Sequence, residues 1–575
     1  MKLYLHQKNN NINDLQRSIG EIERVWKNNE QSGLHLFPEL FLGGYPLQDI
    51  CLQREFIVSY LKSLKSIQEL SSISNNKSIL FGGLDYQLGQ HKEINKIFNC
   101  IYLLDNSGLK VVYRKRLLPN YDIYDEKKYF SPGFENCFIE INGHRFCLLI
   151  CEDMWHSSAH DVDPVDNAYQ EFIQQGLGIS GIINLSASPF NISKQQKRLQ
   201  RAKEISHSFK APFIYVNQIG LNDEILFDGQ SFIINENDIY TAGAFLEEVL
   251  EFEISTSKNI SQPKNIHQPS IVENTWEGLF KPQIENNKFK KLTDSELQEI
   301  LIAQTFGLNQ YAIKTKMKSY LVALSGGIDS AVVLAVASLA AKASNMTVEA
   351  IYMPSQYNSP LSYELSQKMC ENLGIKLKVI NLKFIHQTIK MTFKESVGID
   401  LEGLANENIQ SRLRGNLIYA RSNQNNGMVI NTSNKSELAV GYSTLYGDSV
   451  GALSILGDLF KTEVYQLAKF INQHFNHIIP EEIINRPPSA ELREDQKDED
   501  SLPPYDRLDL ILEAMLSYQY SMEDIIQLGV PKEEVEKVNQ LFYRSEFKRF
   551  QFCPILKLKG KSFGFGHRLP ILKNE

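Results

Sequence analysis

Residues 320–330 have the sequence Tyr320-Leu-Val-Ala-Leu-Ser325-Gly-Gly-Ile-Asp-Ser330, and this stretch decides the fold of the second half of the chain. An apolar run, two glycines and a second apolar stretch predict a strand (320–324), a tight turn and a helix (331–342). Further strands are expected at 348–353, 377–382 and 428–431. Strands that alternate with helices predict a doubly wound parallel sheet, which binds ligands at the carboxyl ends of its strands.

The turn itself has the composition of an anion-binding loop. Its two glycines, Gly326 and Gly327, allow the backbone to turn tightly and to approach a phosphate. Ser325, Ser330 and the free N–H groups at the helix start supply hydrogen-bond donors. The turn lacks Gly-Lys-Ser/Thr and is therefore not a Walker loop. Without its context, a Gly-Gly pair would fit an ordinary turn equally well.

The first half of the chain also alternates apolar runs with amphipathic segments. The runs predict buried strands of a sheet sandwiched between helices, and they lie at 34–36, 79–81, 100–104, 146–150, 181–185 and 212–216. One such helix carries an apolar stripe made of Leu15, Ile19, Ile22 and Trp26.

Composition changes mark the expected domain boundaries. From about 255 to 287 the sequence fills with Asn, Gln, Ser, Lys and Pro, and Thr293-Asp-Ser-Glu296 then has capping-box spacing. We therefore expect domains at 1–254 and 291–575, joined by a linker at 255–290. The charged, proline-bearing segment 491–506 is either a solvated loop or a lid over substrate.

Length and charge limit the classes of partner. With 575 residues the chain must build two or more cores. Its 60 Lys and Arg against 68 Asp and Glu give a net charge of −8, which offers no general attraction for nucleic acid or an anionic membrane. The polar start and the lack of a long apolar run argue against secretion and membrane insertion. Seven scattered cysteines indicate reduced thiols in the cytoplasm.

Glu39, Lys115 and Cys151 each lie at or just after the end of a predicted strand. A thiol is a good nucleophile when a base or a positive field favours the thiolate, and the oxyanion that results needs a donor. A carboxylate and a lysine supply these two functions. Taken singly, such a cysteine is more often a small buried residue, and such a Glu or Lys more often lies on the surface.

The surrounding sequence favours the catalytic interpretation. Phe37-Pro-Glu39-Leu-Phe-Leu-Gly-Gly-Tyr45, Lys115-Arg-Leu-Leu-Pro-Asn-Tyr121 and Cys151-Glu-Asp-Met-Trp155 resemble, in order, three blocks of the nitrilase (carbon–nitrogen hydrolase) superfamily. The resemblance implies an α-β-β-α sandwich, with Glu39 as general base, Lys115 and the Glu152 N–H as oxyanion donors, Cys151 as the thioester-forming nucleophile and Glu126 as an auxiliary carboxylate.

Glutaminase members of this superfamily carry a serine in a segment similar to Asn184-Leu-Ser-Ala-Ser188-Pro, and a basic residue shortly after it. The resemblance therefore implies glutamine contacts at Tyr121, Ser188 and Lys194. Lys194 stands where arginine is expected, and a point charge favours a single contact with the substrate carboxylate over a bidentate one.

In the second half, the loop resembles the pyrophosphatase loop of ATP-dependent adenylylating amidotransferases. Blocks at 407–414, 431–442, 446–448 and 461–462 are similar to those of glutamine-dependent NAD synthetases. The resemblance implies ATP contacts at Ser325, Gly326, Gly327, Asp329, Ser330, Thr432 and Lys461. It implies Mg²⁺ ligands at Asp329 and Glu437, and deamido-NAD contacts at Asn408, Arg412, Lys435 and Asp448.

These resemblances imply one reaction sequence. Glutamine would be hydrolysed at Cys151, ATP would adenylylate the carboxylate of deamido-NAD⁺, and ammonia would displace AMP to give NAD⁺. The family also implies a homo-oligomer formed through the synthetase domain. Two alternatives stay open on the residues alone: another amidotransferase with a pyrophosphatase loop, which would aminate a nucleotide base or aspartate, and a non-catalytic nucleotide-binding scaffold.

Overall fold

The structure is a computed structural model that describes residues 1–28, 30–90, 93–134, 137–155, 163–254, 289–494 and 496–572. The chain divides into two compact units, Met1–Ile271 and Val272–Glu575. The expected linker at 255–290 falls almost wholly outside the described residues, and the boundary at 254 stays a prediction. Within the described ranges, no helix is both long enough and apolar enough to cross a membrane.

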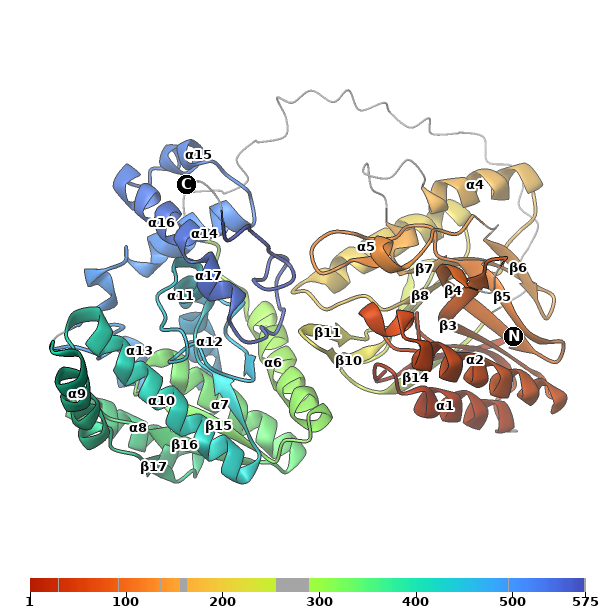
Figure 1. Ribbon diagram of the computed structural model, residues 1–575. Helices are drawn as coiled ribbons and strands as arrows, with labels where there is room; N and C mark the ends of the chain where they lie inside the picture. The colour runs from red at the N-terminus through yellow and green to blue at the C-terminus, as the bar shows by residue number, and fades with distance from the viewer. Residues whose placement is uncertain are drawn as a thin grey trace. The chain divides into compact units, whose positions relative to one another are not determined.

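Two six-stranded sheets form the centre of the first unit (Figure 1). The first sheet has the order β14 (Glu248–Glu253), β1 (Lys2–Gln7), β2 (Gly33–Leu36), β3 (Lys77–Leu88), β4 (Ile94–Asp105) and β5 (Gly108–Arg114). The second has the order β13 (Asp238–Thr241), β12 (Phe232–Asn235), β9 (Phe213–Asn217), β8 (Gly181–Ser186), β7 (His144–Ile150) and β6 (Phe138–Ile141). A separate hairpin pairs β10 (Ile219–Asn222) with β11 (Ile225–Asp228).

Helices cover the outer faces of both sheets. The helices α1 (Leu15–Lys27) and α2 (Arg54–Glu69) pack on the first sheet through a cluster that includes Trp26, Phe56 and Phe81. The helices α4 (Pro164–Gln175) and α5 (Lys194–Phe209) pack on the second sheet through Phe172 and Phe209. The inner faces of the two sheets share one apolar core. The predicted α-β-β-α sandwich is therefore confirmed, and all six predicted strands form.

Short elements complete this unit at its loops. They are η1 (Gln48–Leu52), η2 (Leu70–Ser72), α3 (Glu126–Tyr129) and η3 (Cys151–Met154). Two of them, α3 and η3, begin at residues that the sequence marks as catalytic.

The second unit contains a five-stranded parallel sheet with the order β17-β16-β15-β18-β19. The strands are β15 (Ser319–Leu324), β16 (Thr347–Tyr352), β17 (Leu377–Val379), β18 (Gly427–Asn431) and β19 (Leu453–Ser454). The chain starts at the central strand and winds first to one edge and then to the other, so the predicted doubly wound sheet is confirmed. The strand expected at 377–382 is shorter, because a helix begins at Lys383.

Helices flank this sheet on both faces. The long helices are α6 (Asp294–Lys314), α7 (Ile328–Ser344), α8 (Pro360–Leu373), α9 (Lys383–Val397), α10 (Gly403–Asn425) and α12 (Lys461–His474). The helices α6, α7 and α12 pack together, whereas Leu413 and Ile418 of α10 pack with Leu321 and Val429 of the sheet. The capping box expected at Thr293 and Glu296 starts α6.

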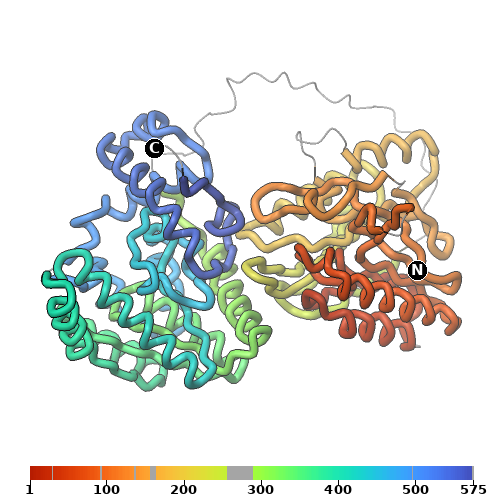
Figure 2. The backbone as a smooth tube through the Cα atoms, in the orientation of Figure 1, coloured from red at the N-terminus to blue at the C-terminus, as the bar shows by residue number. Residues whose placement is uncertain are grey.

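The last part of the chain is helical and then irregular. It comprises α11 (Lys435–Val440) and α13 (Glu481–Asn485) beside the sheet, followed by η5 (Asp498–Asp500), α14 (Tyr505–Leu516), α15 (Met522–Gln527), α16 (Lys532–Arg544) and α17 (Glu546–Phe550). The final segment, dark blue in Figure 2, runs back across the same unit, and Ile555 pairs with Ser454 of β19.

Two histidines on neighbouring strands of the first sheet, one on β1 and one on β2, are buried. His6 Nε2 and His35 Nδ1 are 2.9 Å apart, and His35 Nε2 lies 3.1 Å from the carbonyl oxygen of Gln31. Because a carbonyl can only accept, His35 carries its proton on Nε2 and its Nδ1 accepts from His6. Burial is the main cause that lowers the pKa of His35 to about 4 and that of His6 well below its ordinary value.

This pair predicts an acid-dependent loss of stability in the first unit. In the unfolded chain each histidine has a pKa of about 6.5, so below that pH the unfolded state binds protons that the folded state does not. The two histidines therefore do not lower the free energy of unfolding above pH 6.5. As the pH falls below 6.5, each histidine lowers that free energy by about 1.4 kcal/mol per pH unit until its folded-state pKa is reached.

Thermal unfolding measured from pH 7.5 to 4.5 tests this prediction. The double variant His6→Gln with His35→Asn shares every other titrating group with the wild type. Its melting temperature should therefore decline less steeply as the pH falls. Equal slopes for the two proteins would contradict the prediction.

Candidate active sites

Three charged side chains meet in a buried cluster in the first unit. Lys115, just after β5, donates from Nζ to Glu39 Oε1 and to Glu126 Oε1, at 2.8 Å in each case. Glu39 follows β2 and Glu126 starts α3. The side chains are between 1% and 4% exposed. Three segments distant in sequence thus share one dry site, as their positions at predicted strand ends indicated.

Neutral groups fix the directions of the two carboxylates. Glu39 Oε1 also accepts from Asn99 Nδ2, and Glu39 Oε2 accepts from the backbone N–H of Ala187, both at 2.7 Å. Glu126 Oε1 accepts from the Tyr45 hydroxyl at 3.0 Å. Each carboxylate is therefore held by at least one group besides the lysine.

Burial and charge act against each other within this cluster. Burial would lower the pKa of Lys115, but the carboxylates of Glu126 and Glu39 outweigh it and raise that pKa well above its ordinary value. Burial raises the pKa of Glu126 to about 7, opposed by Lys115 and assisted by the negative charge of Glu39. The lysine is therefore a permanent cation, whereas Glu126 titrates near neutrality.

Cys151 lies on a strained turn directly after β7. Its φ of 44° is in the left-handed region, which costs a non-glycine residue energy. Asn184 stabilises this conformation, because its Oδ1 accepts from the Cys151 N–H at 2.7 Å and its Nδ2 donates to the Cys151 carbonyl at 3.3 Å. Burial, then the charge of Glu39, raises the pKa of the thiol well above its ordinary value, and Lys115 opposes this rise.

The residues expected to bind glutamine surround the same centre. The Tyr121 hydroxyl donates to Glu152 Oε1 at 2.9 Å. Lys194 donates from Nζ to the Pro189 carbonyl at 3.1 Å, and its charge acts on the Cys151 thiol. Ser188 is buried and lies at the end of the β8 segment. The structure thus brings these residues together with Cys151 in one unit.

A buried arginine, which the sequence did not single out, lies behind this group. Arg198 pairs with Asp228 at 2.9 Å and donates to the Ser188 hydroxyl at 3.2 Å. Burial, and after it the positive charge of Arg198, lower the pKa of Lys194 to about 8. Lys194 is therefore a lysine whose charge can be lost at moderately alkaline pH.

In the second unit the glycine turn connects β15 to α7 as expected. Gly326 has a φ of 78°, and a Cβ there would lie 2.6 Å from the Ser362 carbonyl oxygen, so glycine is required. The Ser330 hydroxyl accepts from the Ser325 N–H at 3.2 Å and donates to the Gly327 carbonyl at 3.1 Å. Gly326 and Ser330 therefore shape the loop, while Ser325 and Gly327 line the adjacent pocket.

An ammonium group lies between the two expected metal ligands. Lys461 Nζ donates to Asp329 Oδ2 at 2.5 Å and to Glu437 Oε1 at 3.2 Å. Burial raises the pKa of Glu437 to about 8, opposed by Lys461. Within the described ranges no group of three or more His, Cys, Asp and Glu side chains is placed to hold a metal. Two carboxylates that converge on a cation are nevertheless donors that suit Mg²⁺ when phosphate and water oxygens complete its shell.

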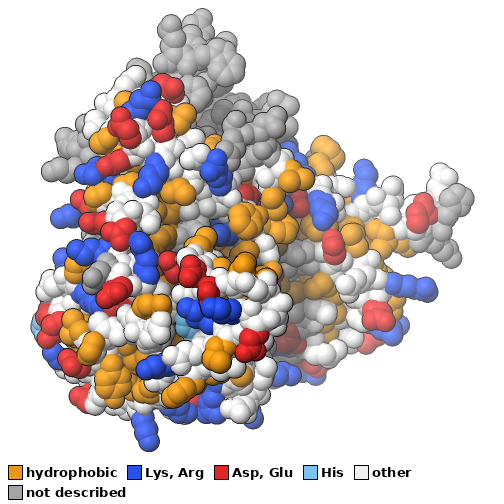
Figure 3. All heavy atoms as spheres, turned by 60° about the vertical axis from the view of Figure 1, so that its left-hand side comes forward, with side chains coloured by type: hydrophobic (Ala, Val, Ile, Leu, Met, Phe, Trp, Pro, Cys, Tyr) orange, Lys and Arg blue, Asp and Glu red, His pale blue; other side chains and the backbone are white. Residues whose placement is uncertain are grey.

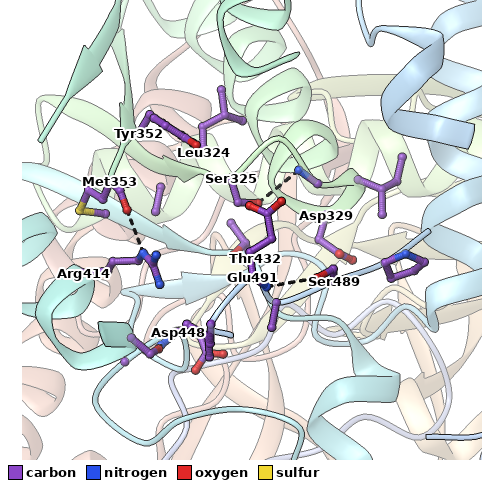
Figure 4. A pocket seen from close by; sticks show the side chains of 18 of the residues that line it. Leu324, Ser325, Asp329, Tyr352, Met353, Arg414, Thr432, Asp448, Ser489 and Glu491 are labelled. Atoms are coloured by element: carbon purple, nitrogen blue, oxygen red, sulfur yellow. Dashed lines mark hydrogen bonds between the residues drawn. The ribbon is translucent and has the colours of Figure 1, made fainter. Parts of the chain in front are cut away.

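A pocket opens at the carboxyl ends of β15, β16 and β18. Figure 4 shows Asp329, Thr432 and Asp448 around it, together with Arg414, which donates to the Met353 carbonyl. Lys461 also lines this pocket. Of the residues expected to contact ATP, the five that line the pocket are Ser325, Gly327, Asp329, Thr432 and Lys461.

The start of segment 491–506 also lines this pocket. Glu491 pairs with Arg486 at 2.5 Å and accepts from Ser362 at 2.7 Å and from Asn358 at 2.8 Å. Asp498 is buried and accepts from Tyr505. Internal contacts thus fix Glu491 and Asp498, and the role of the segment as a lid over substrate stays a prediction.

The expected deamido-NAD contacts are only partly brought together. Asp448 lines the pocket. Asn408 and Arg412 support the segment that leads to Asp448. Asn408 Oδ1 accepts from the Thr444 hydroxyl, and Arg412 Nε donates to the Leu445 carbonyl.

Lys435 requires a correction. Its side chain is 1% exposed, pairs with Asp458 at 2.9 Å and donates to the Lys561 carbonyl. The structure therefore gives this ammonium an internal role, in which it ties α11 to the final segment of the chain. We do not retain Lys435 among the candidates for substrate contact.

Comparison with known proteins agrees with both halves of this description. Residues 5–258 match the carbon-nitrogen hydrolase family and residues 300–551 match the NAD synthase family. Two curated relatives are the glutamine-dependent NAD(+) synthetases of Acinetobacter baylyi (34% identical, covering 97% of this chain and 95% of the relative) and Aquifex aeolicus (33% identical, covering 99% of each).

Solved structures give the same result over the full length. The glutamine-dependent NAD+ synthetase of Acinetobacter baumannii, solved in complex with ADP, is 29% identical with a TM-score of 0.70 and covers 99% of this chain and 98% of its own. The enzyme of Cytophaga hutchinsonii, 17% identical, shares the fold with a TM-score of 0.77 and covers 100% and 98%.

The chain belongs to the glutamine-dependent NAD(+) synthetase family. It is accordingly a carbon–nitrogen ligase with a nitrilase-like glutaminase domain and an NAD synthase domain. This membership decides against both alternatives, an amidotransferase for another acceptor and a non-catalytic scaffold.

Several residues at these sites were not predicted from the sequence. Tyr352 and Met353 line the pocket at the end of β16. They could have been found, because the end of β16 lies at the same sheet edge as the glycine turn. No signal in the sequence marks Asn99, Asn184 or Arg198, whose partners are distant along the chain.

Proposed function

We propose that Glu39, Lys115, Cys151 and Glu126 perform the glutaminase half of the reaction. The observation that carries this proposal is the buried lysine shared by Glu39 and Glu126, because the charges of Lys115 and Glu39 act on the Cys151 thiol. Because the pKa of that thiol is raised, Cys151 is a neutral thiol in the free site and needs a base at the moment of attack.

The reaction steps follow from these positions. Glu39 accepts the thiol proton as Cys151 Sγ bonds to the side-chain carbonyl carbon of glutamine. The oxyanion accepts from Lys115 Nζ and the Glu152 N–H. The C–N bond then breaks, the proton passes from Glu39 to the departing nitrogen, and ammonia leaves a thioester behind. Water that loses a proton to Glu39 adds to the thioester, the C–S bond breaks, and Glu39 returns its proton to the sulfur, which gives glutamate and the free thiol.

Glu126 has one oxygen left for this chemistry. Its Oε2 is buried and has no hydrogen-bond partner among the described residues, whereas its Oε1 is held by Lys115 and Tyr45. A buried oxygen without a partner is costly unless a ligand or water satisfies it. This supports the role of Glu126 in positioning the departing amine and the incoming water.

Tyr121, Ser188 and Lys194 are our candidates for holding glutamine. Lys194 would pair with the α-carboxylate of the substrate as a single cation. Arg198 pairs with Asp228 through one terminal nitrogen and donates to Ser188 through the other, so it supports this subsite from behind.

In the second unit we propose that ATP occupies the pocket beside the glycine turn. A relative was solved with ADP, and the turn presents backbone N–H groups at the start of α7. The carboxylate oxygen of deamido-NAD⁺ bonds to the α-phosphorus and pyrophosphate leaves. Ammonia then bonds to the acyl carbon, loses a proton and displaces AMP. Asp448 is the best-placed candidate for deamido-NAD⁺, with Asn408 and Arg412 supporting its segment.

Asp329 and Glu437 would hold Mg²⁺, which when bound neutralises the charge of the triphosphate. Lys461 supplies a fixed positive charge between these carboxylates. Thr432 lines the same pocket and offers a hydroxyl to the nucleotide.

The two half-reactions require ammonia to move between them unprotonated. Ammonium has no lone pair and cannot attack an acyl-adenylate, and at neutral pH most free ammonia is ammonium. We therefore expect sheltered transfer from the glutaminase site to the synthetase site.

We further propose a cytoplasmic homo-oligomer formed through the synthetase domain. None of the seven cysteines, all of which lie in the described ranges, forms a disulfide, and six of them are buried. The helix α9 exposes Phe384 (75%) and Met391 (63%), which lie two turns apart on one face. Figure 3 turns this side of the molecule forward and shows hydrophobic side chains among Lys and Arg. Such a face suits a second copy of the same chain.

Separate loss of the two half-reactions tests the assignment of roles. Cys151→Ala should abolish NAD⁺ formation from glutamine while leaving synthesis from added ammonium salt. Asp329→Ala should stop synthesis from either nitrogen source, and glutamine hydrolysis should persist. Product analysis with amide-labelled glutamine follows the nitrogen. Loss of both syntheses in Cys151→Ala, or turnover in Asp329→Ala, would contradict the assignment.

The lowered pKa of Lys194 predicts how glutamine capture depends on pH. Above pH 8 the amine loses its charge, so kcat/KM for glutamine hydrolysis should fall by about tenfold per pH unit. Lys194→Arg should keep its affinity up to higher pH, because a guanidinium stays charged. Glutamine with an amidated α-carboxyl is the control substrate and should show no such fall. Parallel profiles for wild type and Lys194→Arg would contradict this role.

The exposed face of α9 predicts the route of assembly. The double variant Phe384→Glu with Met391→Glu should lower the mass measured by light scattering to that of one chain. Leu572→Glu, which also charges an exposed apolar residue, serves as the control and should leave the mass unchanged. A wild-type protein that is already monomeric would refute the proposal.

A further inference from the structure

A single buried carboxylate connects the two segments that carry Lys115 and Cys151. Asp153 is fully buried and accepts four hydrogen bonds. Its Oδ1 accepts from the backbone N–H groups of Arg116 at 3.1 Å and Leu117 at 2.8 Å. Its Oδ2 accepts from the Tyr113 hydroxyl at 3.0 Å and from the Ile150 N–H at 3.1 Å.

The positions of these four donors carry the argument. Tyr113, Arg116 and Leu117 lie on both sides of Lys115, at the end of β5 in the first sheet. Ile150 immediately precedes Cys151, at the end of β7 in the second sheet. Apolar packing between the sheets has no direction of its own, so it does not fix how one strand end lies against the other. Hydrogen bonds to one carboxylate do fix it.

We propose that Asp153 is a positioning residue of the glutaminase reaction, which holds the Lys115 ammonium and the Cys151 thiol at a fixed separation. This inference rests on the roles proposed above for Cys151 and Lys115. Asp153 itself makes its four contacts with the surrounding chain, so it acts through the two groups that it connects.

A carboxylate is the side chain that suits this position. Two oxygens accept from four donors, and an amide would turn an NH₂ group toward one pair of those donors. Burial raises the pKa of Asp153 to about 6, opposed by the Leu117 N–H and by the charge of Lys115, so the acceptor form prevails at neutral pH. The pKa of Tyr113 is raised well above its ordinary value by burial and by the charge of Asp153, which keeps its hydroxyl a donor.

The first experiment compares Asp153→Asn with Asp85→Asn in the full-length enzyme. Asp85 pairs with Arg114, the residue next to Lys115, at 2.7 Å, so the control removes the same charge without touching the connection. In Asp153→Asn we expect kcat for glutamine hydrolysis to fall about 10- to 100-fold, because a shift of about 1 Å has that effect. KM for glutamine should stay within about twofold, and synthesis from ammonium salt should be unchanged. Asp85→Asn should retain wild-type kcat.

The rate at which iodoacetamide alkylates Cys151 gives a second measurement. Its pH profile should shift in Asp153→Asn and not in Asp85→Asn, because Lys115 and Glu39 set the reactivity of the thiol. A variant that kept kcat and this profile unchanged would overturn the proposal. A rise in KM with kcat unchanged would also overturn it, since that would place Asp153 in substrate binding.

Tyr113→Phe keeps the proposal testable should Asp153→Asn lower the melting temperature of the first unit severely. It removes one of the four donors and no charge, and we expect a fall in kcat of about threefold or more with KM maintained. Unchanged kcat in Tyr113→Phe would then overturn the proposal. Cys151→Ala, measured alongside, separates a failure of the proposed function from a failure of the positioning role. If Cys151→Ala still makes NAD⁺ from glutamine, the proposed function is refuted. If Cys151→Ala loses this synthesis but Tyr113→Phe keeps a normal kcat, only the positioning role of Asp153 is refuted.

Discussion

The glutaminase site depends on one buried ammonium that two carboxylates share. A carboxylate taken out of water is unstable unless a cation and hydrogen bonds compensate it, and Lys115 supplies the cation for both Glu39 and Glu126. Burial raises the pKa of Glu126 to about 7 although Lys115 opposes the rise, and the negative charge of Glu39, which shares that lysine, adds to it. The same arrangement holds two carboxylates and an ammonium in one buried cluster whose charges act on the Cys151 thiol, and these are the groups that we propose for proton transfer and for oxyanion stabilisation.

The synthetase unit uses the same arrangement for different chemistry. Lys461 is shared by Asp329 and Glu437 at the edge of the parallel sheet, where the glycine turn and the start of α7 also lie. Here two carboxylates and one ammonium lie beside the pocket, and the raised pKa of Glu437 means that a further cation would favour its ionised form. We propose that the second carboxylate serves proton transfer in the first unit and the retention of a cation in the second.

The sequence allowed both folds and the main site residues to be predicted, because strand ends are easily recognised and functional groups collect there. Glu39, Lys115 and Cys151 follow strands, and so do Ser325 and Thr432. What escaped prediction are the neutral and buried partners, such as Asn184 below Cys151 and Asn99 beside Glu39, whose roles arise only when distant segments meet. Lys435 shows the opposite error. It lies within a motif similar to the family's, yet it pairs internally with Asp458, because a motif gives the residue type and not the direction of the side chain.

Opposite charges attract one another without fixing an angle, so the shared lysines alone do not determine catalytic geometry. In both units a second buried aspartate supplies the directional part. Asp153 accepts from groups on both sides of Lys115 and from the residue before Cys151. Asp509 accepts from the Ser436 hydroxyl and from the N–H and hydroxyl of Thr462, which are neighbours of Glu437 and Lys461. Burial raises the pKa of Asp153 to about 6 and that of Asp509 to about 7. Because the pKa of Glu126 is about 7 and that of Glu437 about 8, acid protonates the lysine-paired carboxylate of each site before it protonates the aspartate that holds the site in shape. The directional hydrogen bonds of Asp153 and Asp509 therefore outlast the charge balance that they surround as the pH falls.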